Sequence, residues 1–448
     1  MEHNRQHDSR GLPQTAASAE AQRAFDATVE AYMAFERQTG DRLKETLALD
    51  PQMPLALCLK GCFLLLFSKR ALVAPAERAL AAARAAAEER GATKRERRHM
   101  DALQLWLDGN LEGAAALWDA ILVDHPHDLV ALRLAQYLHF YLGDAQSLRA
   151  SVARPLYAWN DSVPGYGYVL GIEAFALEEC GDYAAAETTG RAAIERNPAD
   201  IWAAHAVAHV MEMQDRAVEG IAWLDALEPN WRDCHNFTYH VHWHRCLFRL
   251  ERGDHAGVLA DYDTKVRADR SNEFLDVTNA IALLWRLEQR GVAVGERWEE
   301  LSELCRDLCE DHRMVFGDAH FVMGLAARGE PAAVEEALAS LEAFSHTTGS
   351  EAEVARVVGL PLACAAVAHR RGRYAEAVEA LLPHRGALHR IGGSRAQRDL
   401  FEQLLIDAAL KAGEGRLAQA LLSERRLLRP DNPWNQRMTA EAERLAAA

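Results

Sequence analysis

The chain contains 448 residues, enough for two or three ordinary domains or for one elongated array of repeats. Its apolar share of 49% and its charged share of 26% are typical of a folded soluble protein and exclude a disordered one. The 66 acidic residues outnumber the 50 basic ones. The resulting net charge of −16 excludes nucleic acid as the main partner, because proteins that bind the phosphate backbone present a basic face.

The N-terminal segment has no apolar core and mixes charges of both signs, so we expect residues 1–20 to form a flexible tail and not a secretory signal. The most apolar run, residues 55–67, includes Lys60 and is shorter than the ~20 residues that span a bilayer, so no membrane partner is expected. The eight cysteines form no Cys-x-x-Cys motif, which favours reduced thiols and a cytoplasmic location.

Apolar residues recur at helical spacing along almost the whole chain, and alternating strand patterns are nearly absent. Residues 21–100 are expected to form two or three degenerate helical hairpins, and residues 431–448 a C-terminal helix or tail. Between them, residues 101–430 show repeated punctuation: a glycine that ends one helix, then a helix rich in small residues, then a proline and an aspartate that can cap the next helix.

The repeat has the spacing of a tetratricopeptide unit, since Gly109 and Gly143 lie 34 residues apart. We therefore predict an all-α fold, a right-handed superhelix of tetratricopeptide-like helical hairpins (an α-solenoid). The later turns at Gly253, Gly329 and Gly372 are irregularly spaced and leave the number of repeats open. The concave face of such a superhelix typically binds peptides or proteins, so a plain protein–protein interaction scaffold is one interpretation.

Six of the nineteen histidines lie between positions 205 and 244. Residues 200–213 and 236–250 are expected to be the first helices of consecutive hairpins, and each places a polar stripe on one face through spacings of three and four residues. The first stripe is His205, His209 and Glu212, and the second is Asn236, His240 and His244.

Other polar residues recur on the expected concave helices, namely Glu178, His139, Asp318 and His320. Near the C-terminus, two glycines and Ser394 precede a helix that begins with Gln397, Arg398 and Asp399 in its first turns. This segment is either a well-capped helix with an internal Arg–Asp pair or an anchor for an anion that faces the groove.

Three interpretations of the histidines remain open. In the first, the histidines are structural groups that pair between helices. In the second, they bind a metal ion, and the imidazoles come from His205, His209, His240 and His244. The zinc-peptidase motif HExxH is absent from the sequence. In the third, they line a metal-free pocket where Glu212 or Glu178 serves as a hydrogen-bonding or acid–base group. No cofactor is expected apart from that metal ion, and no catalytic residue is assigned.

Several longer stretches resemble those of tetratricopeptide repeat protein 38 and its bacterial relatives, in the same order over roughly residues 100–430: GYGYVLGIEAFALEECGDYAAAE, WAAHAVAHVMEMQ, EGIAWL, NFTYHVHWHRCLF, GDAHF and IGGSRAQRDLF. The resemblance implies a helical repeat protein and implies no activity. The residue that follows Ser394 varies in that family, which favours Gln397, Arg398 and Asp399 over Arg395 as site residues.

These patterns favour a cytoplasmic tetratricopeptide-repeat protein with a histidine-rich concave pocket. The expected partner is a small molecule or short peptide in the groove, with a further protein partner as an alternative. The alternative of another class is a hydrolase-like enzyme built in the groove that uses a metal ion or a histidine with a carboxylate.

Overall fold

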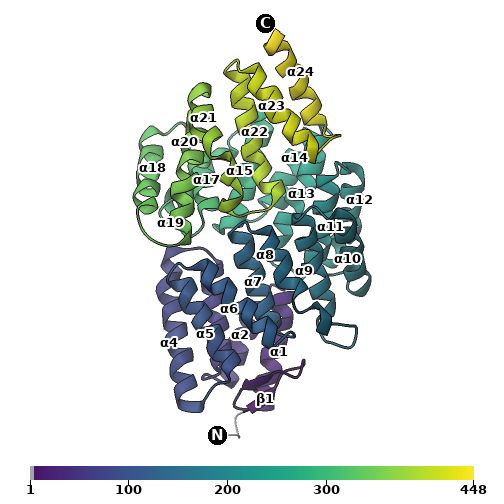
Figure 1. Cartoon of the computed structure of the whole chain (residues 1–448), viewed down its shortest axis with the longest axis vertical. Coiled ribbons are helices and arrows are strands. Elements are labelled where there is room, and N and C mark those ends of the chain that lie inside the picture. Colours follow the sequence, from purple (N-terminus) through teal and green to yellow (C-terminus); the bar gives the residue numbers. More distant parts are fainter. Residues whose placement is uncertain (1–4, 448) are drawn as a thin grey trace. The chain divides into compact units, whose positions relative to one another are not determined.

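The computed structural model describes residues 5–447, which form two compact units. Unit 1 comprises Met1–Val207 with Leu227–Thr238, and unit 2 comprises Ala208–Ala226 with Tyr239–Ala448. Helices α11, α12 and α13 each contribute residues to both units, because one boundary falls inside each of them. The predicted all-α fold of helical hairpins is confirmed, and the helices follow one another in chain order through both units (Figure 1).

The elements up to the first boundary are β1 (Arg5–His7), β2 (Pro13–Thr15), α1 (Ala19–Met33), α2 (Thr39–Leu49), α3 (Pro54–Leu66), α4 (Val73–Arg90), α5 (Lys94–Leu107), α6 (Leu111–Asp124), α7 (Leu129–Tyr141), α8 (Ala145–Ala153), α9 (Tyr166–Glu179), α10 (Tyr183–Arg196) and α11 (Ile201–Met213). The elements that follow are α12 (Ala217–Leu227), α13 (Phe237–Glu251), α14 (His255–Asp261), α15 (Phe274–Gln289), α16 (Arg297–Leu308), α17 (Val315–Arg328), α18 (Pro331–Ser345), α19 (Ser350–Val354), α20 (Leu360–Arg370), α21 (Tyr374–Leu381), α22 (Arg395–Lys411), α23 (Gly415–Leu428) and α24 (Pro433–Ala447).

The turns and caps of unit 1 follow the repeat pattern. Gly109 and Gly181 have φ values of +78° and +83°, the left-handed conformation that ends the first helix of a hairpin. Asp128 and Asp200 cap the next helices, since their Oδ1 atoms accept hydrogen bonds from the backbone N–H groups of Ala131 at 2.9 Å and of Ala203 at 3.0 Å. Both predicted aspartate caps are confirmed.

The segment expected to be a flexible tail contains a two-stranded antiparallel hairpin, β1 with β2, among its described residues. Gly11, with φ of +82°, closes its turn against Asp8. The hairpin is fixed by Glu96 on α5, whose carboxylate accepts hydrogen bonds from both the backbone N–H and the hydroxyl of Thr15 at 2.9 Å. The partner lies 81 residues further along the chain, outside the reach of a local sequence pattern. Residues 1–4 of the expected tail lie outside the described residues.

Unit 2 closes on itself through its last helices. The guanidinium of Arg429, between α23 and α24, donates to the Asp215 carboxylate at 2.7 Å and to the backbone carbonyl of Glu212 at 2.9 Å. On α15, Arg286 donates to the carbonyl of Ala396 on α22 at 3.0 Å. These bonds join residues that are 110 to 217 positions apart, so the last helices of unit 2 contact the first.

Helices α19 and α20 form one apolar run, Ser350–Arg370, through a π-helical turn at Ala355–Gly359. The turn precedes Pro361, which has no N–H group and displaces the backbone of the preceding turn. By length and composition this run is the one candidate membrane span among the described residues, and 67% of its most apolar window is buried inside the structure, as in a core helix.

Candidate functional site

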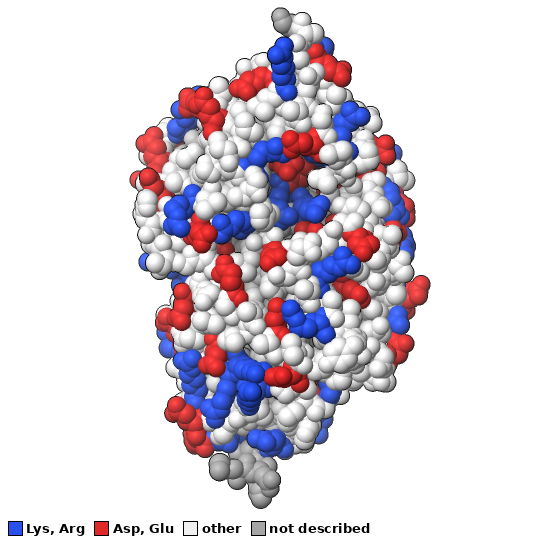
Figure 2. Space-filling model, viewed as in Figure 1, with Lys and Arg blue, Asp and Glu red and all other residues white. Residues whose placement is uncertain are grey.

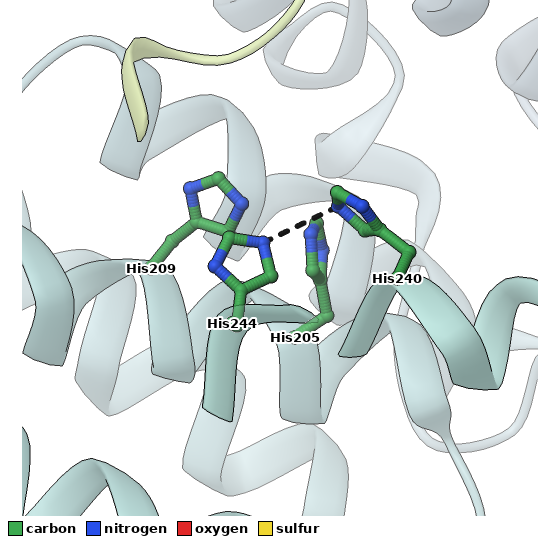
Figure 3. A group of neighbouring side chains, drawn as sticks. All are labelled: His205, His209, His240 and His244. Atoms are coloured by element: carbon green, nitrogen blue, oxygen red, sulfur yellow. Dashed lines mark hydrogen bonds between the residues drawn. The ribbon is translucent and has the colours of Figure 1, made fainter. Parts of the chain in front are cut away.

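The clustered histidines come together as neighbours on two helices (Figure 3). His240 and His244 lie one turn apart on α13, and His209 lies on α11 one turn after His205. All four side chains are buried. One ring nitrogen from each of them lies within 4.8 Å of the corresponding nitrogens of the other three. We call these four residues the histidine cluster.

Hydrogen bonds fix the two imidazoles of α13 on both of their edges. Nδ1 of His244 lies 2.9 Å from Oε2 of Glu212, and its Nε2 lies 3.3 Å from Nε2 of His240, the dashed line in Figure 3. The other edge of the His240 ring faces α15, also in unit 2, and its Nδ1 lies 3.3 Å from Oδ1 of Asn279. The two Nε2 atoms therefore face one another.

Aromatic rings surround the cluster. In unit 1, the ring of His205 packs against those of Phe175, Trp202 and Phe237, with centroids 5.1 to 5.5 Å apart. In unit 2, the ring of His209 lies 4.3 Å from that of His244, and His240 stacks on Trp243. Burial, together with the neighbouring imidazoles, lowers the pKa of His240 and of His244 well below 6.5, so both rings are neutral at pH 7 and have a lone pair.

A cavity of about 520 Å³ lies within unit 2 beside Glu212. Its walls come from the α11–α12 turn, from α13, α15 and α22, and from the connection between α23 and α24. In Figure 2, basic and acidic side chains meet at a hollow in the part of the view that α13, α15 and α22 occupy in Figure 1. The charged lining residues are Glu212, Asp215, Arg216, Glu219, Glu251, Arg252, Arg286, Arg290, Asp399 and Arg429.

Most of the buried charges at the cavity are paired. Arg290 lies 3.1 Å from Glu251, Arg429 lies 2.7 Å from Asp215, and the carboxylate of Asp399 lies 3.6 Å from Arg429. Asp399 is partly buried, and its pKa falls well below its usual range: the loss of hydration alone would raise the pKa, but the nearby guanidinium groups, with Arg425 first, outweigh that effect. It is therefore a permanent anion at the cavity wall.

Arg286 is the exception. Its side chain is 1% exposed, and its guanidinium donates to the backbone carbonyls of Ala282 and Ala396, at 3.4 and 3.0 Å. Within the part of the chain that the structure describes, no carboxylate lies within ion-pair distance of it. Burial lowers the pKa of Arg286 to about 10, against the opposing effect of Asp399 and Glu212, so the group remains cationic at pH 7.

The structure brings several residues of the predicted stripes together. His209, Glu212, His240 and His244 are neighbours, and Asp399 lines the adjacent cavity. Asn236 of the second stripe precedes α13 and hydrogen-bonds to His235 in unit 1. The amide of Asn279 on α15 contacts His240, with Oδ1 lying 3.3 Å from Nδ1.

The remaining predicted residues are all buried. In unit 1, Glu178 is fully buried on α9 and His139 lies 3.1 Å from Asp119. On α17 of unit 2, Asp318 lies 3.3 Å from His312, and Nδ1 of His320 lies 2.7 Å from the carbonyl of Phe316. None of these residues lines the cavity.

The segment with two glycines is a capped helix start. Ser394 and Gln397 form a reciprocal capping box, and Arg398 donates to the carbonyls of Gly392 and Gly393. Asp399 pairs with Arg425 at 2.7 Å and so joins α22 to α23. The capping box is the arrangement that the interpretation as a well-capped helix predicts.

The polar residues that α15 contributes to the site, Asn279 and Arg286, were not predicted from the sequence. They lie seven positions apart and therefore on one face of the helix, and residues 280–285 between them are all apolar. Buried polar groups on an apolar helix need partners, so this pattern was the available signal.

No family model matches the chain. Among solved structures it is similar to yeast Tom70, with 12% sequence identity, coverage of 95% of this chain and 87% of that one, and a TM-score of 0.36. The tetratricopeptide domain of P58(IPK) matches at 14% identity over 79% of this chain and 99% of that one, with a TM-score of 0.22. The Naa15/Naa10 complex bound to HypK-THB matches at 11% identity over 95% and 66%, with a TM-score of 0.26. The assignment of the repeat fold therefore rests on the helical hairpins themselves.

Proposed function

We propose that this chain is a tetratricopeptide-like binding protein whose unit 2 binds a small molecule with a carboxylate or phosphate group in the cavity beside the histidine cluster. The single observation that carries the proposal is Arg286, a buried guanidinium at the cavity wall that has no carboxylate partner among the described residues. A buried charge is costly unless it is paired, and a guanidinium pairs best with a planar or tetrahedral anion.

The size and composition of the cavity support this proposal. A volume of about 520 Å³ is in the range of small-molecule sites, and Asp399, Arg290 and Glu251 provide further polar groups around the ligand. Asp215 has a φ of +56° where the repeat normally has glycine, and its carboxylate is held by Arg429 and Asn432. Strained backbone of this kind is often found at binding sites.

Closure of unit 2 favours a small molecule over an extended peptide. A peptide-binding scaffold requires an open groove, whereas here the last helices return to Glu212 and Asp215 through Arg429. The ligand is therefore enclosed on the side where a peptide chain would need to continue.

The test is thermal unfolding of the purified protein with a panel of small carboxylates and sugar phosphates, compared with the variants Arg286→Met and Arg297→Met. Arg297 is a matched control because it forms an ion pair with Asp263 at 2.6 Å on the surface of the same unit. We expect at least one compound to stabilise the wild type and Arg297→Met but not Arg286→Met. Equal stabilisation of all three proteins, or of none, would refute the proposal.

A second candidate function, catalysis by histidine with a carboxylate, is favoured by one observation. Glu212 lines the cavity and also contacts His244, so an acid–base pair borders the ligand space. Turnover of a bound compound that Glu212→Gln abolishes without loss of binding would support it.

We also propose that the protein is cytoplasmic and is related to tetratricopeptide repeat protein 38. The absence of a Cys-x-x-Cys motif and the shared sequence stretches support these two points. A further protein partner, bound outside the cavity, is compatible with a helical repeat fold.

A further inference from the structure

The facing imidazoles of α13 have the separation of two metal ligands. Nε2 of His240 and Nε2 of His244 lie 3.3 Å apart. Two nitrogens bound to one zinc ion at about 2.0–2.1 Å and at the tetrahedral angle are separated by roughly 3.3–3.4 Å. The measured separation therefore equals the edge of a tetrahedral site.

The partners of the two rings determine which nitrogens have lone pairs. An ionised carboxylate only accepts hydrogen bonds, so Glu212 requires a proton on Nδ1 of His244, whose Nε2 is then unprotonated. Where Oδ1 of Asn279 likewise accepts from Nδ1 of His240, Nε2 of His240 is also unprotonated. Two lone pairs then face one another at 3.3 Å, an unfavourable arrangement unless a cation lies beside them.

Glu212 and Asn279 are also the outer partners that metal-bound histidines usually have. The second nitrogen of such a histidine normally donates to a carboxylate or a carbonyl oxygen, which fixes the ring and makes it a better ligand. Here each ring of α13 has one such oxygen, at 2.9 and 3.3 Å. His209 contributes a third imidazole from α11, with its ring centroid 4.3 Å from that of His244.

From this geometry we propose that the histidine cluster binds a divalent transition-metal ion, with zinc as the principal candidate. His240 and His244 provide their Nε2 atoms and His209 provides a third nitrogen, so all three ligands belong to unit 2. An all-imidazole set suits zinc, copper or nickel and disfavours magnesium and calcium, which prefer oxygen ligands. This metal site goes beyond the proposed ligand cavity and does not depend on it.

The competing arrangement needs no metal. If the amide of Asn279 is rotated, its nitrogen donates to Nδ1 of His240, and His240 then donates from Nε2 to His244. The result is a continuous hydrogen-bond chain that ends at Glu212. The experiment distinguishes this chain from the metal site.

The test uses the full-length protein, stripped with a chelator and then titrated with Co²⁺ and Zn²⁺. We expect one ion per chain by elemental analysis and Co²⁺ absorption bands typical of tetrahedral nitrogen ligation. His240→Gln and His209→Gln should each weaken Zn²⁺ binding by more than the 10- to 100-fold typical of outer-shell changes. The surface variant His346→Gln should bind as the wild type does.

Far-UV circular dichroism shows whether each variant is folded, and two separate ligand variants keep the test valid if one of them does not fold. A folded wild-type protein that retains less than about a tenth of an equivalent of Zn²⁺ would overturn the proposal, as would wild-type affinity in both folded histidine variants. Arg286→Met should keep its Zn²⁺, so failure of the ligand cavity and failure of the metal site give different results.

Discussion

A hydrogen bond of 2.9 Å joins Nδ1 of His244 to Oε2 of Glu212, and the side chain of Glu212 also lines the charged cavity of unit 2. One carboxylate thus belongs to two sites, as the outer partner of an imidazole and as part of the cavity wall. Burial raises the pKa of Glu212, and the nearby Arg429 and His209 partly offset that rise. Any change in this carboxylate should therefore affect the histidine cluster and the cavity together.

Glu212→Gln should weaken Zn²⁺ binding about 10- to 100-fold, because the amide removes the negative charge that makes His244 a better ligand. Competition with a chelator of known affinity measures the change. Glu219→Gln is the matched control, since Glu219 lines the same cavity and pairs with Arg216 at its surface. Equal losses in the two variants would assign the effect to cavity charge in general.

Asp128→Asn should lower the free energy of unfolding by about 3–5 kcal/mol. Asp128 is buried in unit 1 and lies 2.6 Å from Arg95 and 3.0 Å from His99, so its neutralisation leaves a buried guanidinium without its counter-ion. Asparagine keeps the helix cap to Ala131 and isolates the effect of charge. Urea denaturation is the measurement, and Asp124→Asn, which breaks the surface pair with Arg98, should leave the midpoint unchanged.

His320 should make the protein sensitive to acid. Burial lowers its pKa to about 4, with a smaller contribution from Arg286, whereas in the unfolded chain the value is 6.5. Between these pH values the unfolded chain binds more protons, so stability that is fully present above pH 6.5 is lost as the pH falls to 4. The loss is on the order of 3 kcal/mol.

The measurement is urea denaturation at pH 7 and at pH 5 with a chelator present, on the wild type and on His320→Gln. The variant should lose less stability on acidification than the wild type does. His346→Gln, an exposed histidine of the same unit, should behave as the wild type, and an identical acid response in all three proteins would exclude His320 as the cause.

Gly220→Ala should destabilise the protein by about 1–3 kcal/mol, because an added Cβ on α12 would lie within 2.3 to 2.7 Å of ring atoms of Phe248. Phe248 also lines the cavity, so a shift of its ring should change the shape of the cavity. Gly40→Ala, where no atom lies within 4 Å of the added Cβ, should leave stability unchanged or raise it by up to about 1 kcal/mol. Thermal unfolding compares the two variants directly.

Local patterns predicted the repeat fold and the histidine cluster because both depend on short-range spacing. A glycine turn, an aspartate cap and histidines four residues apart are each set within one or two helical turns, and Asp128, Gly109 and the pair His240 and His244 lie as expected. The start of α22 is also capped locally, by Ser394 with Gln397, although its sequence pattern left a capped helix and an anion anchor as alternatives.

The cavity was beyond such patterns. Arg286 depends on a carbonyl 110 residues later, and Arg429 depends on residues more than 210 positions earlier, so no local periodicity relates them. The contact of Asn279 with His240 was not predicted for the same reason, since Asn279 lies 39 residues away on another helix. These distant residues meet because the later repeats fold back onto the first helices of unit 2. The turns of those repeats are irregularly spaced, so the sequence does not predict which residues meet.

The bond between Arg429 and Asp215 has a consequence for biosynthesis. The two residues are separated by 214 positions, and at about 5–20 residues per second a ribosome needs roughly 10 to 40 seconds to travel from one to the other. During that interval the cavity lacks one wall and the Asp215 turn lacks the cation that stabilises it. The cavity can therefore be completed only after residue 429 has emerged, and until then the charges that line it are exposed to water and to chaperones.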